Sequence, residues 1–222
     1  MRNKFRIIGF GDSITLGAKA TMDEYNWLGV LEHQWRYFFN NPVEVINKGV
    51  GDNTISPRTT NYDETTKPSA LERTQDDVIH LNPDLILICF GLNDMRLGTP
   101  IEVFSEDLEK IIIQIKSACP EAIIILTNVF HMTGWGRYFP RDRGSIELTK
   151  IYNEAIGLIG EKHHIPVADV SGAMAFKDYL INEDGVHAND LGHRIIGNRV
   201  FETIARHTQF LNGNIEKDEG RL

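Results

Sequence analysis

The sequence is poor in cysteine and contains no long apolar run. Among its 222 residues there are two cysteines, Cys89 and Cys119, which are too few for a disulfide framework and lack the spacing of metal ligands. No stretch approaches the roughly 20 apolar residues that cross a bilayer. The apolar stretch near the start is expected to be too short for a secretory leader. We therefore expect a cytoplasmic protein that does not span a membrane.

Positive charge is scarce as well. The chain has 23 Lys and Arg against 31 Asp and Glu, which gives a formal net charge of −8. No cluster of basic residues offsets the repulsion that a phosphate backbone would meet, so nucleic acid is not an expected partner. With 41% apolar and 24% charged residues, the composition is typical of a globular protein.

Three familiar glycine-containing signatures are missing. The stretch GFGDSITLG, residues 9–17, has Ile14 where a dinucleotide fingerprint requires its third glycine, and it lacks the Gly-Lys-Ser/Thr end of a P-loop. The G-x-S-x-G turn is absent too. If Ser13 in this stretch is a nucleophile, it belongs to another arrangement. The alternative is an ordinary turn between a strand and a helix.

Five short apolar runs recur along the chain, at residues 5–10, 43–46, 85–90, 122–127 and 165–170. They are nearly continuous in Ile, Leu and Val, which is typical of parallel strands buried on both faces. Segments with helical spacing lie between and after them, at residues 25–39, 69–81, 103–118, 145–163, 173–180 and 188–207. This alternation predicts a doubly wound α/β domain over residues 1–210. A polar tail follows at residues 211–222.

A candidate base for Ser13 comes from the other end of the chain. A serine hydroxyl needs a base within hydrogen-bond reach, and that base needs a third group to orient it. In DGVH, residues 184–187, Asp184 and His187 are three positions apart on a turn and can lie on one side of it. Asp184 could then bind one ring nitrogen while the other faces the serine. The same residues could also be a plain turn before a helix.

The remaining requirement is a set of donors for the oxyanion of a tetrahedral intermediate. Asn93 follows the third apolar run in GLND, and Gly49 and Gly51 follow the second in NKGVGDNT. Ser13 adds its own N–H at the start of a helix. Asn93 could instead cap a helix, and the glycines could be turn residues. Because ligands bind beyond the carboxyl ends of parallel strands, we expect these segments to meet at one edge.

The stretches GDSITLG, NKGVGDNT, GLND and DGVH, in this order, resemble the four signature blocks of the SGNH (GDSL-type) esterase/lipase family. The resemblance implies a three-layer, flavodoxin-like α/β sandwich with a five-stranded parallel sheet, and neither a cofactor nor a metal. It implies Ser13 as nucleophile, His187 as base and Asp184 as the partner of the base. Ser13 N–H, Asn93 and a glycine of the second block would form the oxyanion hole.

The second block leaves the identity of that glycine open. An ungapped match to the pattern NxGxxGxT, counted from Asn47, places Asp52 at the oxyanion position, whereas a one-residue shortening places Gly51 there. We predict Gly51, because a backbone donor is needed and a carboxylate would repel the oxyanion. Gly49 is the other candidate.

Neighbouring polar residues are predicted to have structural roles. Asp12 is expected to hold the turn that presents Ser13, and Asp94 to hold Asn93. Asp169 is predicted to cap a helix. Surface or packing roles are expected for His163, His164 and His193.

The long connection at residues 130–145 carries aromatic and basic side chains. Connections of this length at such an edge are more often functional than idle. Trp135, Arg137 and Tyr138 could line a pocket for an acyl chain or a sugar. They could equally cover a hydrophobic gap or meet another subunit.

These residues predict a serine esterase that acts on small or short-acyl esters, for example an acetylated carbohydrate, through an acyl-enzyme. The expected partner is thus a small-molecule ester. The alternatives are a lysophospholipase or thioesterase with the same residues, a non-catalytic module that binds carbohydrate or acyl groups, and metal-assisted hydrolysis with Asp184 and His187.

Overall fold

The computed structural model describes residues 4–39 and 42–208. Its centre is a five-stranded sheet in the order β2-β1-β3-β4-β5, in which all neighbouring strands are parallel. The strands are β1 (Phe5–Gly11), β2 (Val43–Gly49), β3 (Leu85–Cys89), β4 (Ile123–Thr127) and β5 (Val167–Ala168). The predicted five-stranded parallel sheet is confirmed. The tail predicted at residues 211–222 lies outside the described residues.

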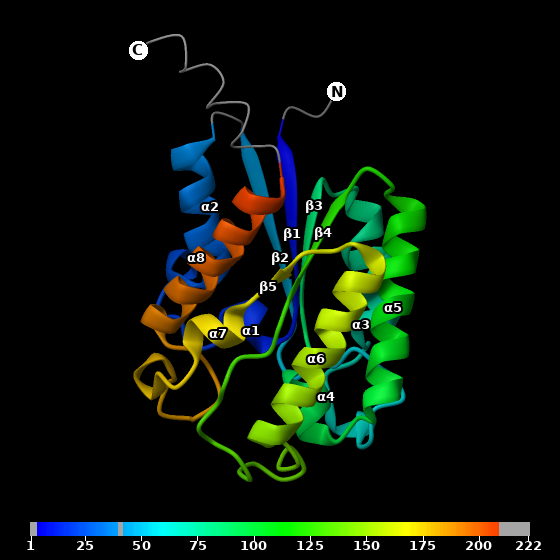
Figure 1. Ribbon diagram of the computed structural model, residues 1–222, viewed down its shortest axis with the longest axis vertical. Helices are drawn as coiled ribbons and strands as arrows, with labels where there is room; N and C mark the ends of the chain where they lie inside the picture. Colours follow the sequence, from blue (N-terminus) through cyan, green and yellow to red (C-terminus); the bar gives the residue numbers. More distant parts are fainter. Residues whose placement is uncertain (1–3, 40–41, 209–222) are drawn as a thin grey trace.

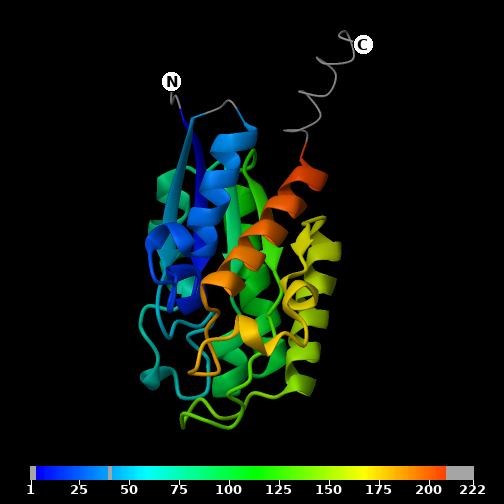
Figure 2. The same ribbon diagram turned by 90° about the vertical axis from the view of Figure 1, so that its left-hand side faces the viewer.

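Helices cover both faces of the sheet, which gives three layers (Figure 1). One outer layer contains α2 (Trp27–Phe38) and α8 (Asp190–His207), which pack against each other. The other contains α3 (Ala70–Asp77), α5 (Ile101–Ala118) and α6 (Ile146–His163). Figure 2, turned by 90°, shows α2 and α8 in front of the sheet. Shorter helices lie near the strand ends: α1 (Ser13–Leu16), α4 (Leu92–Leu97), α7 (Val170–Met174), and one-turn 3₁₀ helices at Asp23–Tyr25, Tyr62–Glu64, Ile79–Leu81 and Asp178–Leu180.

The central strands are buried on both faces, which explains their continuous apolar pattern. Ile7 and Ile8 in β1 and Leu85 and Ile86 in β3 have no exposed surface. Neighbouring side chains of a strand point to opposite faces, so both layers of helices pack on apolar surface. No helix in the described part of the chain is long and apolar enough to cross a membrane.

Some element boundaries differ from the prediction. The apolar run at residues 165–170 yields only a two-residue β5, because Asp169 ends it by capping α7 through a hydrogen bond from Gly172 N–H. The helix predicted over residues 69–81 ends at Asp77 and continues as a separate 3₁₀ turn. The helix predicted over residues 173–180 is divided between α7 and another 3₁₀ turn. Capping and turn hydrogen bonds decide these boundaries, and periodicity does not reveal them.

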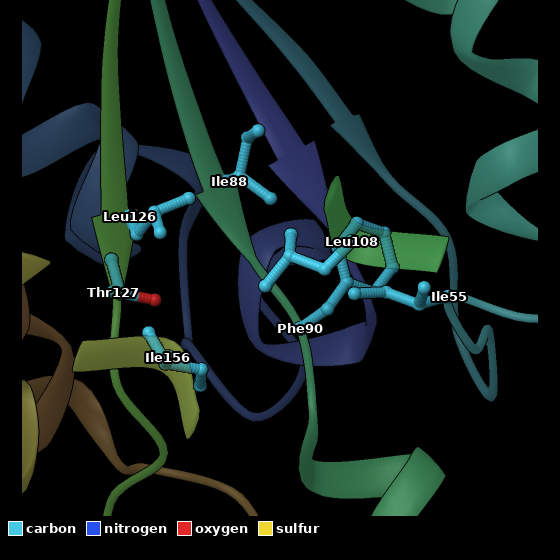
Figure 3. Close-up of a pocket in the computed structure, with 7 residues that line it drawn as sticks. All are labelled: Ile55, Ile88, Phe90, Leu108, Leu126, Thr127 and Ile156. Atoms are coloured by element: carbon cyan, nitrogen blue, oxygen red, sulfur yellow. The ribbon is translucent and has the colours of Figure 1, made fainter. Parts of the chain in front are cut away.

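A small cavity lies in the core between the sheet and the helices α5 and α6 (Figure 3). Its volume is about 10 Å³, which is at the lower limit of what one water molecule requires. Apolar side chains form most of its wall: Ile55, Ile88, Phe90, Leu108, Leu126 and Ile156, with Thr127 as the polar member. The cavity is therefore a packing defect and has no room for a substrate.

Candidate active site

The carboxyl ends of β1, β2 and β3 lie side by side at the lower edge of the sheet in Figure 1. The register pairs Gly11 with Gly49 and with Cys89, so the segments after these residues start at the same level. Each of the first three sequence blocks thus begins at this edge. The fourth block, at residues 184–187, reaches the edge from the connection that precedes α8.

Ser13 is the first residue of α1 and is largely buried. Asp12 caps the helix, as predicted, because its Oδ1 accepts a hydrogen bond from Ile14 N–H at 2.9 Å. The cap fixes the tight turn between β1 and α1 and so sets the position of the Ser13 hydroxyl.

His187 and Asp184 lie beside Ser13 in space although they are more than 170 residues away in sequence. His187 Nε2 is 2.9 Å from Ser13 Oγ, and His187 Nδ1 is 2.7 Å from Asp184 Oδ2. The other oxygen of Asp184 accepts hydrogen bonds from Val186 N–H at 2.9 Å and His187 N–H at 3.0 Å. The three side chains that we predicted from the sequence therefore form one continuous hydrogen-bonded chain.

The turn at residues 184–187 is built to keep Asp184 ionised. Partial burial of Asp184 works to raise its pKa, but the hydrogen bonds from the backbone and ring of His187 and from Val186 outweigh it and hold the pKa below the ordinary value. Gly185 allows the turn because its φ of 73° is in the left-handed region. An ionised Asp184 fixes the ring of His187 with Nδ1 as the donor, which leaves Nε2 as the acceptor that faces Ser13.

Asn93 lies inside α4 and is buried. Its side chain donates to Asn53 O at 3.1 Å, while the carboxylate of Asp94 accepts from Ile55 N–H at 3.0 Å. The residue that caps α4 is Gly91, so the alternative that Asn93 serves as a helix cap is wrong. Asn93 and Asp94 together tie α4 to the segment that follows β2.

Two buried carboxyl groups of the site have unusual acidity. Burial raises the pKa of Asp12 to about 7, against the opposing effects of Ile14 N–H, Arg96 and Arg73. Burial likewise raises the pKa of Asp94 to about 7, against the hydrogen bond from Ile55 N–H. At neutral pH each of these two carboxyl groups is therefore only partly ionised.

Arg73 is a residue of the site that sequence reasoning missed. It projects from α3, is 4% exposed, and donates to Gly11 O at 2.8 Å and Lys48 O at 3.0 Å. Its Nε donates to Asn53 Oδ1 at 2.9 Å. Arg73 thus joins the ends of β1 and β2 to the residue that holds Asn93. The only signal in the sequence is an arginine on the buried face of a short helix.

The two glycines of the second block, Gly49 and Gly51, have different surroundings. A Cβ at Gly49 would lie 2.0 Å from Leu16 N, because β2 and α1 touch there. A Cβ at Gly51 would meet only Leu16 Cδ2, at 3.9 Å. Gly49 is therefore required for packing, whereas Gly51 has free space beside it.

Substitution of these glycines by alanine is expected to change stability by very different amounts. Gly49→Ala forces a side chain into the backbone of α1 and should lower the free energy of unfolding by about 3 kcal/mol. Gly51→Ala meets no clash and should change the free energy of unfolding by less than about 1 kcal/mol. Urea unfolding of both variants tests this. Equal losses in the two variants would contradict the packing role of Gly49.

The connection at residues 130–145 borders the site on two sides. Thr133 N–H and Gly134 N–H donate to Gly185 O at 2.9 and 2.7 Å. Tyr138 Oη donates to Asp184 O at 3.0 Å. Farther along, Arg141 Nε is 3.1 Å from Asp52 Oδ1, next to Gly51. The connection therefore extends from the turn that carries His187 to the second block.

The predicted substrate contacts differ in where they lie. Tyr138 is half exposed at the edge of the site, and Trp135 packs partly against the core. Arg137 is exposed, and its side chain makes no ion pair or hydrogen bond with the described residues.

His193 is fully buried, and its Nε2 is 3.2 Å from Ala18 O, as expected of a packing residue.

Comparison with known proteins gives both a sequence match and fold matches. A sequence model described as the GDSL-like lipase/acylhydrolase family matches residues 10–195. The solved structure of the lipase/acylhydrolase from Enterococcus faecalis is 24% identical, with a TM-score of 0.71, over 90% of this chain and 95% of that chain. An acetylxylan esterase from Geobacillus stearothermophilus is 18% identical, with a TM-score of 0.70, over 95% and 99%. No match was found among the curated proteins.

Proposed function

Since the chain belongs to the GDSL-like lipase/acylhydrolase family, and is therefore an acyl hydrolase, we propose that it cleaves carboxylic esters through Ser13, His187 and Asp184. The observation that carries this proposal is the hydrogen-bonded chain from Asp184 through His187 to Ser13, with distances of 2.7 and 2.9 Å. A serine, an imidazole and a carboxylate that are hydrogen-bonded in this order form the arrangement that activates a serine for nucleophilic attack.

In the first half of the reaction, Ser13 Oγ attacks the ester carbonyl carbon. His187 Nε2 takes the proton from Ser13, and Asp184 stabilises the imidazolium that forms. Collapse of the tetrahedral intermediate breaks the bond to the alcohol oxygen, which receives the proton from His187. The acyl group is then bound to Ser13 as an ester.

In the second half, a water molecule takes the place of the alcohol. His187 accepts a proton from the water, and the hydroxide attacks the acyl carbon. The carboxylic acid leaves, and the proton returns from His187 to Ser13 Oγ. The enzyme ends the cycle in its starting state.

The oxyanion of both tetrahedral intermediates is proposed to bind Ser13 N–H, Gly51 N–H and the side-chain amide of Asn93. The hydrogen bond from Asn93 to Asn53 O, at 3.1 Å, supports this role because it fixes the plane of the amide. The free space beside Gly51 leaves its backbone open to a ligand. One such donor is worth about 10² to 10³ in rate.

The proposed substrate is a small molecule with a short acyl group, such as an acetylated carbohydrate. The fold similarity to an acetylxylan esterase supports an acetyl ester. Ser13 also stands at a broad sheet edge bordered by the partly exposed side chains of Tyr138 and His187.

A longer acyl chain, as in a lysophospholipid or a thioester, is the second candidate. It is favoured by a hollow of about 170 Å³ beside the start of the 130–145 connection. Mostly apolar atoms line it, from residues that include His131, Ile146, Ala175 and Phe176. A hollow of this size could hold several methylene groups.

Kinetics with 4-nitrophenyl acetate, butyrate, octanoate and decanoate decide between the two candidates. We expect kcat/KM to be highest for acetate or butyrate and about tenfold lower for octanoate, as a preference for a short acyl group requires. A steady rise in kcat/KM beyond octanoate would favour the second candidate. Ligand binding without turnover would indicate a non-catalytic module, and loss of activity in EDTA with recovery on adding a divalent metal would indicate metal-assisted hydrolysis.

A further inference from the structure

Arg96 is a buried cation that lies close to the proposed oxyanion hole. It follows Asn93 by three positions in α4, so the two side chains lie on neighbouring parts of one helix surface. Arg96 is 5% exposed, and no described residue forms a hydrogen bond or ion pair with its guanidinium. Its Nε is buried without an acceptor. Buried cations are normally paired because they are costly to remove from water.

Two other arginines near the site, Arg73 and Arg141, each have a carboxylate in contact. Arg73 Nη1 is 2.8 Å from Asp77 Oδ2, and Arg141 Nε is 3.1 Å from Asp52 Oδ1. Arg96 has no such contact and lies within the electrostatic reach of Arg141, Asp52 and Asp12. A guanidinium stays protonated at any ordinary pH. Arg96 is therefore a buried positive charge that no carboxylate of the described residues contacts.

A second unsatisfied donor lies next to Arg96. The indole N–H of Trp135 is buried without an acceptor. Both side chains flank Gly144, because a Cβ at that position would lie 2.9 Å from Trp135 Cζ3 and 3.1 Å from Arg96 Cγ. Arg143 N–H also donates to Arg96 O at 3.1 Å, which fixes the 130–145 connection to α4. Donors without acceptors therefore gather between α4 and this connection.

We propose that Arg96 binds an anionic oxygen group, a carboxylate or a phosphate, that the ester substrate carries. This inference rests on the proposed function and specifies its substrate class. A guanidinium is suited to both groups, since its planar N–H fork matches two oxygens at once. Its place three residues from Asn93 positions the anion beside the ester that reacts.

The competing explanation is that Arg96 only balances the charge of Asp12 from a distance. In that case removal of Arg96 would disturb the turn that presents Ser13. Hydrolysis of every ester would then fall by the same factor, chiefly through kcat. Binding of a substrate anion instead predicts a loss confined to anionic esters, chiefly through KM. The two roles are thus separated by the split between KM and kcat.

The test compares esters of similar size that carry either an anionic or a neutral group. The first set is 4-acetoxybenzoate, 4-acetoxyphenyl phosphate and the neutral 4-acetoxybenzamide, which place the group on the alcohol. The second is monophenyl adipate and the neutral phenyl hexanoate, which place it on the acyl chain. In at least one set we expect the anionic ester to have a kcat/KM about tenfold higher than its neutral partner, from the strength of a charge-assisted hydrogen bond. The benzoate and the phosphate separate the two sources of the anion.

Arg96→Met should remove this preference and leave the neutral esters within about twofold of wild type, and Arg96→Lys should keep part of it. Arg36→Met is the matched control, because it removes the same charge from an exposed position on α2 and should alter neither ester. Inhibition of the wild-type protein by 4-hydroxybenzoate and by 4-hydroxybenzamide gives the same comparison without any variant. If the substrate carries its anion on the alcohol, we expect the benzoate to inhibit at least tenfold more strongly than the benzamide.

Three outcomes would overturn the inference. If the neutral esters are hydrolysed and no anionic ester is preferred, this inference is wrong while the proposed function stands. An equal loss for neutral and anionic esters in Arg96→Met would assign Arg96 to the turn at Asp12. No hydrolysis of any ester would overturn the proposed function itself, and this inference with it.

Discussion

Ser13→Ala is expected to lower kcat for 4-nitrophenyl acetate by on the order of 10⁴-fold or more. The variant keeps the cap of α1, which depends on Asp12, so the fold should be unchanged. It loses the hydroxyl that lies 2.9 Å from His187 Nε2, and with it the oxygen proposed to take the acyl group. Steady-state rates with purified protein, together with a thermal unfolding midpoint close to wild type, test the prediction.

Two further variants test whether the loss of activity is specific to the Ser13 hydroxyl. Ser171→Ala is the matched control, because Ser171 lies in α7 and its hydroxyl makes no hydrogen bond with the described residues. It should retain wild-type activity within about twofold, as surface substitutions usually do. The double variant of Ser13→Ala with His187→Ala should lose no more than Ser13→Ala alone, since the two groups act as a unit. Activity of Ser13→Ala within a few-fold of wild type would remove Ser13 from the mechanism.

Asp184→Asn should lower kcat by on the order of 10³-fold while KM changes little. An asparagine can still accept the hydrogen bonds from Val186 N–H and His187 N–H through its oxygen. Its amide group then faces His187 Nδ1 and favours the tautomer with the proton on Nε2, which cannot accept the proton of Ser13. The loss thus arises from the wrong tautomer within an intact turn.

The control for Asp184 is Asp169→Asn. Asp169 also accepts a backbone hydrogen bond, from Gly172 N–H at 2.9 Å, but it does not touch His187. This variant should keep its activity within about twofold and lose only part of the cap of α7. Unchanged turnover in Asp184→Asn would show that His187 does not depend on the carboxylate.

The fold could be predicted from the sequence because its central strands are buried on both faces. Burial of Ile7, Ile8, Leu85 and Ile86 leaves a continuous apolar pattern that few other structures produce. The edge strand β5 was predicted poorly. Asp169 ends it after two residues, and a cap of this kind depends on local hydrogen bonds that apolar periodicity does not record.

The candidate site was predictable to the extent that its residues occur in short blocks. Ser13, Asn93, Asp184 and His187 each stand in a stretch whose residue types suit one chemical role. Their proximity follows from the parallel topology, which brings the ends of successive strands to one edge. Their catalytic roles stay a prediction that the variants above test.

The supporting residues could not be predicted because their partners are distant in sequence. Arg73 contacts the carbonyl of Gly11, more than 60 positions earlier, and the stretch ALERTQDD around it reads as an ordinary helix. Arg96 is equally plain in sequence, as a basic residue near the end of a short helix. Only the packing of the 130–145 connection over α4 shows that its charge is buried and unpaired.

The most direct test of the account is covalent trapping of the nucleophile. Wild-type protein, Ser13→Ala and His187→Ala are treated with diisopropyl fluorophosphate, and intact mass and peptide mapping locate the adduct. We predict a single adduct on Ser13 in the wild type, none in Ser13→Ala and labelling slowed by at least about 10³-fold in His187→Ala. A wild-type protein that hydrolyses esters yet remains unlabelled, or carries its adduct on another residue, would contradict the account.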